Sequence, residues 1–258
     1  MKITSLIENT SGCGSVEVEH GLSLYIETGD HNILFDMGQT ELFYQNATAL
    51  GIDLTKVDVA VLSHGHYDHG GGLKKFLEIN NIAPVYVHKD AFLPHYNGTD
   101  KYIGLDASLK DDPRIIFTDG EYHISESLTL FSCNGFERKH PLLSSGLYEK
   151  VGDDFIDDDF RHEQYLLIEQ GSKRVLISGC SHKGILDIAH WFSPDILIGG
   201  FHYSKLEPGG FLECAAKELA GYMAEFYTCH CTGTLQFEFM KKFMPSLKYL
   251  SCGQSVVI

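Results

Sequence analysis

Three histidines and an aspartate crowd into the short sequence HGHYDH, as His64, His66, Asp68 and His69. The largely apolar run Val57–Leu62 before them predicts a buried strand, and the glycines after His69 predict a turn into a helix. Residues two apart on an extended segment face the same way, so His64 and His66 can hold one cation while Asp68 and His69 point toward another. This spacing predicts a metal centre of the two-ion type that activates water for hydrolysis.

A second motif, SGCSHKGI, repeats the order of an apolar strand followed by chemically active residues. It follows the predicted strand Arg174–Ser178, and its position mirrors the first loop. His182 is therefore the candidate third ligand beside His64 and His66. Cys180 can act as a metal-bound thiolate or as a small buried side chain, and the sequence leaves both roles open.

A histidine also follows each of two further predicted strands. His202 follows the strand that begins at Asp195, where it could position a substrate, act as an acid or support the fold. His230 ends the last of these strands, with Cys229 and Cys231 on either side. Strand alternation would turn both cysteines away from the face of His230, which predicts core or supporting positions for them.

In this order, the motifs GHYDHGGG, SGCSHKGI, GGFH and HCTG make the chain resemble the metallo-β-lactamase superfamily, whose signature is HxHxDH. The resemblance implies an α+β fold, a four-layer αββα sandwich, and two divalent metal ions, most often Zn²⁺ with Fe or Mn as alternatives. It also implies that His230 completes the second metal site with Asp68 and His69, and that Cys180 stands where many members carry a bridging aspartate. Asp36, in DMG, resembles the aspartate that steadies the metal-binding loop, with a turn or helix-cap role as the alternative.

More narrowly, the motifs resemble a branch named for 7,8-dihydropterin-6-methyl-4-(β-D-ribofuranosyl)aminobenzene-5′-phosphate synthase, a methanopterin-pathway condensation. Many superfamily enzymes have a separate histidine between the first loop and the position of His182, and His140 is the candidate for it here. The segment near 91–160 is predicted to be variable and is a candidate cover for the active site. Its acidic run Asp153–Asp159 is predicted as a solvated loop, with a lid as the alternative. The basic stretch Arg138–His140 is predicted at the surface, with phosphate binding as the alternative.

Composition limits the remaining possibilities. The 258 residues are 43% hydrophobic, enough for a large core, and predict a single domain over 1–258. The formal net charge of −15 argues against a nucleic-acid partner. Without a secretory signal or an apolar run of about 18 residues, we expect a cytoplasmic protein with no membrane partner. The seven cysteines are then expected to be reduced thiols.

Periodicity and turn signals predict the elements that must position these residues. One helix is expected over Thr40–Leu50, a second directly after the first metal loop (His64–His69, HGHYDH), and a third over Ile185–Phe192. Their alternation with strands suits two sheets packed face to face with helices outside. The strands expected in addition to those above are Lys2–Asn9, Leu22–Glu27, Asn32–Asp36, Pro84–His88, Arg114–Thr118, Ser127–Phe131, Gln164–Glu169, Leu247–Ser251 and Ser255–Ile258.

The function predicted from these observations is a metal-dependent hydrolase in which a metal-bound hydroxide attacks an ester or phosphoester-type substrate. Asp68 would orient the hydroxide and carry its proton, and His202 or a metal-bound water would protonate the leaving group. The expected partner is a small-molecule substrate, phosphorylated or pterin-like if the resemblance extends that far. The alternatives are a transferase that condenses a dihydropterin with a ribofuranosyl-aminobenzene phosphate, a di-iron oxidoreductase with the same ligands, and a non-catalytic metal sensor.

Overall fold

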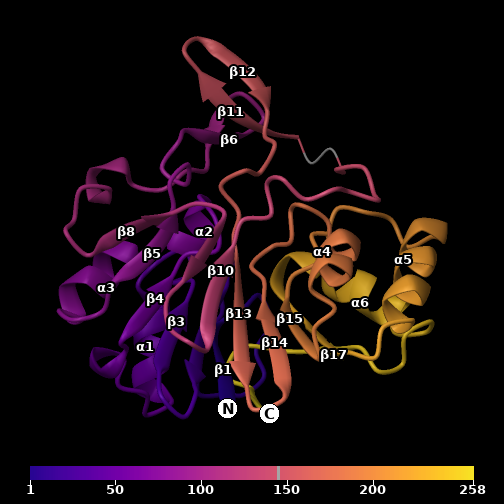
Figure 1. Cartoon of the computed structure of the whole chain (residues 1–258), viewed down its shortest axis with the longest axis horizontal. Coiled ribbons are helices and arrows are strands. Elements are labelled where there is room, and N and C mark those ends of the chain that lie inside the picture. The colour runs from indigo at the N-terminus through magenta and orange to yellow at the C-terminus, as the bar shows by residue number, and fades with distance from the viewer. Residues whose placement is uncertain (144–145) are drawn as a thin grey trace.

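Two seven-stranded sheets lie face to face at the centre of the computed structural model, which describes residues 1–143 and 146–258 (Figure 1). The first sheet has the order β18-β1-β2-β3-β4-β5-β8, and the second β17-β16-β15-β14-β13-β10-β9. The strands of the first are β1 Lys2–Ile7, β2 Ser23–Glu27, β3 Asn32–Phe35, β4 Val59–Val61, β5 Val85–His88, β8 Ile115–Thr118 and β18 Ser255–Val257. Those of the second are β9 Glu121–His123, β10 Leu128–Phe131, β13 Tyr165–Gln170, β14 Lys173–Ile177, β15 Ile196–Gly199, β16 Glu225–Thr228 and β17 Lys248–Tyr249.

Helices cover the outer face of each sheet, which gives the predicted αββα order (Figure 1). Apolar side chains such as Leu24 and Leu166 fill the space between the sheets. Two further apolar clusters lie outside, one under the helices of the first sheet and one under those of the second. The first sheet carries α1 Leu42–Ala49 and α3 Leu73–Ile79, and the second carries α4 Ile185–Phe192, α5 Gly210–Ala220 and α6 Thr234–Met240. Shorter helical segments are α2 Tyr67–Gly70, η1 Leu54–Lys56, η2 Ala107–Leu109 and η3 His230–Thr232.

The elements expected before residue 89 and from residue 164 to residue 199 are found with small shifts at their ends. The sequence prediction did not include α5 and α6. Within the described residues, none of the helices combines the length and the apolar character that crossing a membrane requires.

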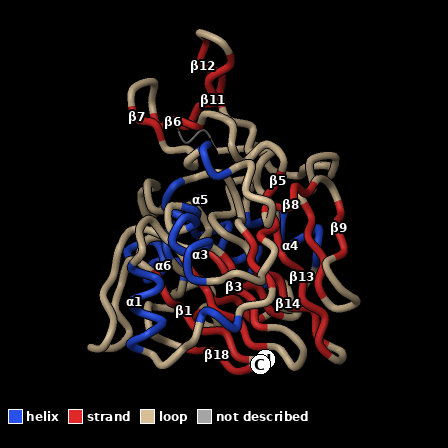
Figure 2. Tube along the Cα trace, turned by 90° about the vertical axis from the view of Figure 1, so that its left-hand side faces the viewer, coloured by secondary structure: helices blue, strands red, loops and turns tan. Residues whose placement is uncertain are grey.

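A small four-stranded sheet of order β12-β11-β6-β7 protrudes from one end of the sandwich (Figure 2). Its strands are β6 His95–Asn97, β7 Lys101–Tyr102, β11 Leu147–Val151 and β12 Asp154–Asp157. The prediction of a solvated loop for the acidic run is therefore wrong, because β12 pairs along its length with β11. Composition concealed this strand because Asp154 and Asp157 expose their side chains while their backbones are paired, and Asp158, at the end of the run, is buried.

Gln164 joins the two large sheets beside the first metal loop. Its side-chain Nε2 donates to the carbonyl oxygens of Leu62 at 2.8 Å and Tyr86 at 3.2 Å. Its Oε1 accepts from the Thr118 hydroxyl at 2.7 Å. All of these groups are buried, so each would be costly to leave unpaired.

Replacing Gln164 with Leu should lower the free energy of unfolding by about 3 kcal/mol. A shape-similar side chain removes the partner of the Leu62 carbonyl and of the Thr118 hydroxyl, and one of the two donors to the Tyr86 carbonyl. Urea unfolding with an unchanged m value would measure this loss. The matched control Gln45→Leu, at an exposed position of α1, should change stability by less than about 0.5 kcal/mol. Equal stability of the two variants would contradict the bridging role.

Candidate metal centre

The loops that follow parallel strands of the two sheets meet at one end of the sandwich. In the first sheet β3, β4 and β5 are parallel, and in the second β14, β15 and β16 are parallel. HGHYDH follows β4, SGCSHKGI follows β14, GGFH follows β15 and HCTG follows β16. Four segments that are distant in sequence therefore bring their polar side chains together.

His64, His66 and His182 form the first group of candidate ligands. One ring nitrogen from each lies within 4.8 Å of the others, and all three side chains are buried. Among the described residues, Nε2 of His64, Nε2 of His66 and both ring nitrogens of His182 have no hydrogen-bond partner. Burial, reinforced by the neighbouring imidazoles, lowers the pKa of each ring well below its ordinary value. Neutral, unpartnered and converging nitrogens fit a divalent cation.

A second group adjoins the first and includes the remaining predicted ligands. Nε2 of His69 lies 3.2 Å from Nε2 of His230 and 3.1 Å from Sγ of Cys180. Oδ2 of Asp68 lies 3.6 Å from Nε2 of His230 and 3.2 Å from Nε2 of His20, a residue that the sequence analysis missed. Burial opposes ionisation of Asp68, but these two histidines outweigh it and hold the pKa of the carboxyl well below its usual range.

Cys180 occupies the boundary between the two groups. One ligand atom each from His64, His69 and Cys180 lies within 4.8 Å of the other two. Burial, followed by the neighbouring Cys231 thiol, raises the pKa of Cys180 well above its ordinary value. Without a cation the sulfur is therefore a thiol, and a bound cation would make it a thiolate.

Asp36 holds the first metal loop in place through hydrogen bonds to Ser63 and His69. Its Oδ1 accepts from the Ser63 backbone N–H at 2.7 Å, and its Oδ2 accepts from the Ser63 hydroxyl at 2.7 Å and from Nδ1 of His69 at 2.6 Å. The Ser63 hydroxyl in turn accepts from Nδ1 of His64 at 2.8 Å. In the neutral rings both protons therefore sit on Nδ1, which leaves Nε2 as a lone pair. Burial opposes protonation of His69, but Asp36 outweighs it and raises the pKa of this ring above its ordinary value, so a cation at Nε2 would displace a proton. Of the two roles considered for Asp36, these contacts match the loop-steadying one.

Buried glutamates hold the other two ligand loops in a similar way. Glu163 accepts through Oε1 from the backbone N–H of His182 at 2.7 Å. Glu8 accepts through Oε1 from the backbone N–H of His230 at 2.6 Å. Oδ1 of Asn9 accepts from Nδ1 of His230 at 2.9 Å, so the Nε2 of this histidine also presents a lone pair toward the other candidate ligands.

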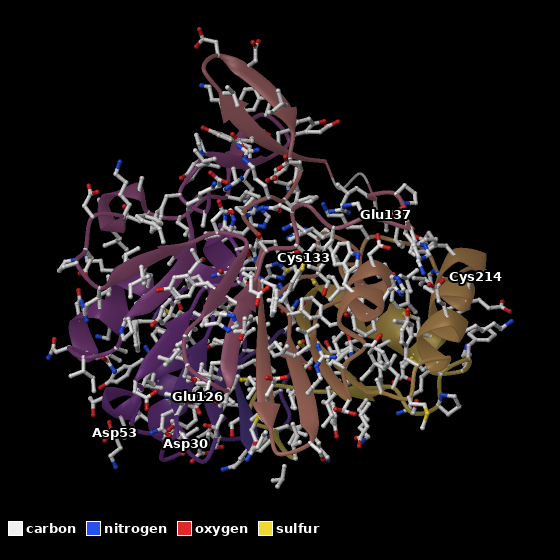
Figure 3. The ribbon with its side chains drawn as sticks, in the orientation of Figure 1. Asp30, Asp53, Glu126, Cys133, Glu137 and Cys214 are labelled. Atoms are coloured by element: carbon white, nitrogen blue, oxygen red, sulfur yellow. The ribbon has the colours of Figure 1, made fainter. Side chains whose placement is uncertain are left out.

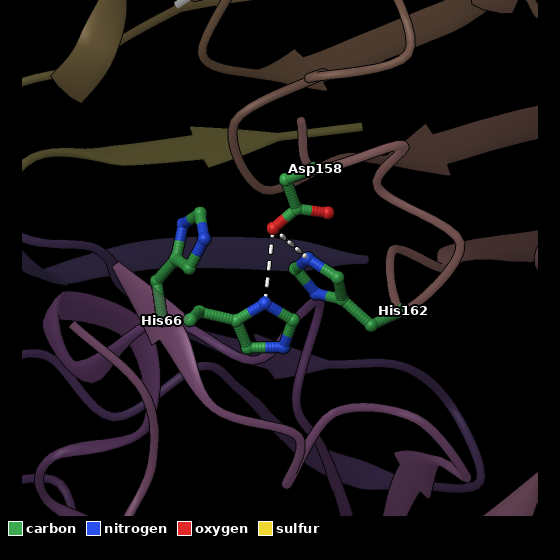
Figure 4. A group of neighbouring side chains, drawn as sticks. His66, Asp158 and His162 are labelled. Atoms are coloured by element: carbon green, nitrogen blue, oxygen red, sulfur yellow. Dashed lines mark hydrogen bonds and ion pairs between the residues drawn. The ribbon is translucent and has the colours of Figure 1, made fainter. Parts of the chain in front are cut away.

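A further buried cluster beside His66 joins the protruding sheet to the metal loop. Oδ2 of Asp158 accepts from Nδ1 of His95 at 2.9 Å and from Nε2 of His162 at 3.2 Å (Figure 4). Nδ1 of His162 accepts from the Gly65 N–H at 2.9 Å. Burial opposes ionisation of Asp158, but its two histidine partners hold the pKa of this carboxyl far below the ordinary range. The sequence analysis missed this cluster, although the four-residue spacing of Asp158 and His162 was visible.

His140 is not among the groups of candidate ligands in the described residues, but it lines the smaller cavity with His182 and His202, so its role as the separate histidine stays a prediction. Its Nε2 pairs with Glu218 of α5 at 3.0 Å. Nη1 of Arg138 donates to the carbonyl oxygen of Lys183, and the Lys139 N–H donates to Asp187 of α4. These contacts hold the basic stretch against α4, α5 and the loop of Lys183, with His140 at the edge of the smaller cavity.

Two cavities open beside the ligands and share His182 and His202. The larger, of about 180 Å³, is lined by both ligand groups and by Lys101 and Lys205. The smaller, of about 80 Å³, is largely apolar and is lined by Leu186, Phe201, Tyr203, Phe211 and others. Burial lowers the pKa of His202 to about 4, which keeps this ring neutral near pH 7.

The family model of the metallo-beta-lactamase superfamily matches residues 16–206, which contain the first three of the four loop motifs. The chain belongs to the metallo-β-lactamase superfamily. Among superfamily structures, the crystal structure of Tm1679, a metal-dependent hydrolase of the beta-lactamase superfamily, is 28% identical to it, with a TM-score of 0.83 over 100% of this chain and 99% of the other.

Two relatives from Methanocaldococcus jannaschii extend this relationship in sequence. An uncharacterized protein is 32% identical over 212 residues, covering 78% of each chain. The 7,8-dihydropterin-6-methyl-4-(beta-D-ribofuranosyl)-aminobenzene-5'-phosphate synthase is 28% identical, covering 99% of this chain and 96% of its own length. The resemblance to this branch of the superfamily therefore extends over nearly the whole chain.

Replacing Asp36 with Asn should lower metal affinity about 10- to 100-fold, because the amide cannot accept from all three donors that orient His64 and His69. Competition titration of Zn²⁺ against a chromophoric chelator would measure the change. Asp30→Asn is the control, because Asp30 is exposed in the turn between β2 and β3, away from the ligands (Figure 3). Equal affinities of both variants would contradict the role of Asp36.

Replacing Asp158 with Asn should also weaken Zn²⁺ binding, by about tenfold, because His162 would no longer be held against the backbone of the metal loop. The neighbouring exposed residue provides a matched control, Asp157→Asn, which should bind as the unmodified protein does. The same chelator competition distinguishes the two. An unaltered affinity in Asp158→Asn would show that the cluster does not position the metal loop.

Proposed function

We propose that this protein is a metal-dependent hydrolase that acts on small ester or phosphoester-type substrates. The observation that carries the proposal is the convergence of unpartnered ring nitrogens from His64, His66 and His182 beside a cavity. A fold without a cation would leave these buried groups uncompensated. Membership of the superfamily and the similarity to a metal-dependent hydrolase along the whole chain support the same conclusion.

The donor atoms fit two neighbouring divalent cations, with Zn²⁺ favoured by the nitrogen and sulfur donors and Fe or Mn as alternatives. Bound cations of this kind polarise the attacked oxygen and make a water molecule acidic enough to act as the nucleophile near neutral pH. The first cation would be held by His64, His66 and His182. The second would be held by Asp68, His69 and His230, with Cys180 between the two.

Asp68 and His202 would act directly on the reactants. Asp68 is ionised, is held by His20 and His230 and lines the larger cavity, so it can accept a hydrogen bond from the attacking water and orient it. His202 borders both cavities, so its ring can contact the leaving group. Because this ring is neutral, its contribution would be a hydrogen bond from its single N–H.

The walls of the cavities favour an amphipathic anion as substrate. Lys101 and Lys205 line the larger cavity of a chain whose formal charge is −15, so they provide local attraction for a negative group. The smaller cavity offers apolar walls to the remainder of the molecule. The combined volumes suit a small molecule.

A transferase is the second candidate function. The synthase relative is 28% identical over nearly the whole length of both chains, and two adjoining cavities could each receive one reactant. Metal-loaded protein should be assayed in parallel for hydrolysis of aryl esters and phosphodiesters and for condensation of a dihydropterin with a ribofuranosyl-aminobenzene phosphate. Hydrolysis alone supports the first proposal, and a pterin-dependent product without hydrolysis overturns it. Bound iron with a redox-sensitive optical spectrum would instead favour an oxidoreductase.

Replacing His66 with Ala should remove metal from the first ligand group and reduce hydrolysis to the background rate, because two nitrogens hold a divalent cation far more weakly than three. Elemental analysis and the assay above would measure both effects. The control is His123→Ala, at an exposed position of β9, and this variant should keep its metal and its activity. Full metal content in His66→Ala would refute the ligand assignment.

A further inference from the structure

Cys229 and Cys231 flank His230, but the structure places them in different environments. Cys229 is fully buried in the apolar cluster between the sheets, as expected. Strand β16 ends at Thr228, and His230 begins η3 with a positive φ of 46°. Strand alternation therefore does not extend to Cys231. Cys231 is buried and also lines the wall of the larger cavity.

The Cys231 thiol lies among candidate ligands of the second group. One ligand atom each from Cys180, His230 and Cys231 lies within 4.8 Å of the other two. Sγ of Cys231 contacts the carbonyl oxygen of Cys180 at 3.5 Å. Gly200 packs directly against this sulfur, because a Cβ there would lie only 2.3 Å from Sγ. The close approach of the Gly200 backbone holds the thiol on the side of Cys180.

We propose that Cys231 supplies a second sulfur ligand to the metal centre, alongside Cys180. The inference rests on the proposed metal-dependent function and deepens it, because two thiolates select thiophilic ions such as Zn²⁺ or Fe²⁺ over Mg²⁺ and Mn²⁺. As each sulfur–metal bond forms, the corresponding S–H bond breaks and its proton passes to solvent. The sulfur electron pairs form the new bonds, so no oxidant or reductant is required.

Packing alone does not account for this cysteine. A small buried side chain with no ligand role needs apolar neighbours, which Cys229 has. Cys231 instead shares its cavity wall with Asp68, His182 and His230. The two cysteines therefore form a natural pair for comparison, since they flank the same histidine and differ in what their sulfurs face.

Cobalt(II) substitution under a non-thiol reductant tests the proposal on the full chain. Thiolate-to-cobalt charge transfer in the near ultraviolet reports sulfur ligands independently of activity. Cys231→Ser and Cys180→Ser should each reduce this absorption per bound cobalt to about half, and the double variant should abolish it. Cys229→Ser is the matched control and should retain the full absorption. Circular dichroism would confirm that each variant is folded.

The outcomes distinguish failure of the sulfur assignment from failure of the proposed metal-dependent function. Wild-type absorption per bound cobalt in folded Cys231→Ser would overturn the sulfur assignment while leaving the metal centre intact. Failure of the unmodified protein to bind cobalt or zinc would overturn the proposed function as well. X-ray absorption of the zinc-loaded protein gives a second readout: replacing Cys231 with Ser should lower the number of sulfur scatterers per zinc at about 2.3 Å, and an unchanged number contradicts the proposal.

Discussion

The arrangement of the first metal loop depends on the hydrogen bonds that the carboxylate of Asp36 accepts. It is fully buried, and its oxygens accept from the backbone and hydroxyl of Ser63 and from the ring of His69. Hydrogen bonds to an ionised group contribute about 1.5 to 3 kcal/mol each, roughly twice the value of neutral ones. The loop is therefore held in a ligand-presenting conformation by the protein itself, before any cation arrives.

Buried carboxylates also accept hydrogen bonds from the backbone of the other two ligand loops. Glu163 receives the N–H of His182, and Glu8 receives the N–H of His230, both from buried positions. Each loop thus has a carboxylate beneath it and imidazole lone pairs above it. Imidazole nitrogens over buried anions create a place where positive charge is favoured. This arrangement accounts for the burial of acidic groups in a chain that is already strongly acidic.

Local patterns in the sequence predicted most of the strands and the loops that carry the candidate ligands, and the resemblance to a superfamily supplied the four-layer sandwich. Each predicted ligand follows a strand whose apolar run was visible, and the carboxyl ends of parallel strands meet at one edge of a sheet. His20, His95 and His162 escaped prediction because their roles depend on contacts between segments far apart in the chain. The alternation argument does not reach Cys231, because the turn before it begins at His230, whose φ is positive, and no alternation rule anticipates such a turn. His140 pairs with Glu218 at the edge of the smaller cavity, a contact that the sequence did not reveal.

The protruding sheet and the predicted ligands belong to different segments of the chain. Asn97, Lys101 and Leu147, which lie in or at the ends of its strands, line the larger cavity, yet the four-stranded sheet supplies none of the predicted ligands. Its attachment through Asp158 is concentrated at its base, while the turns between its strands extend into solvent. Sequence changes and length variation at those turns should therefore alter the entrance of the larger cavity more than they alter the positions of the predicted ligands.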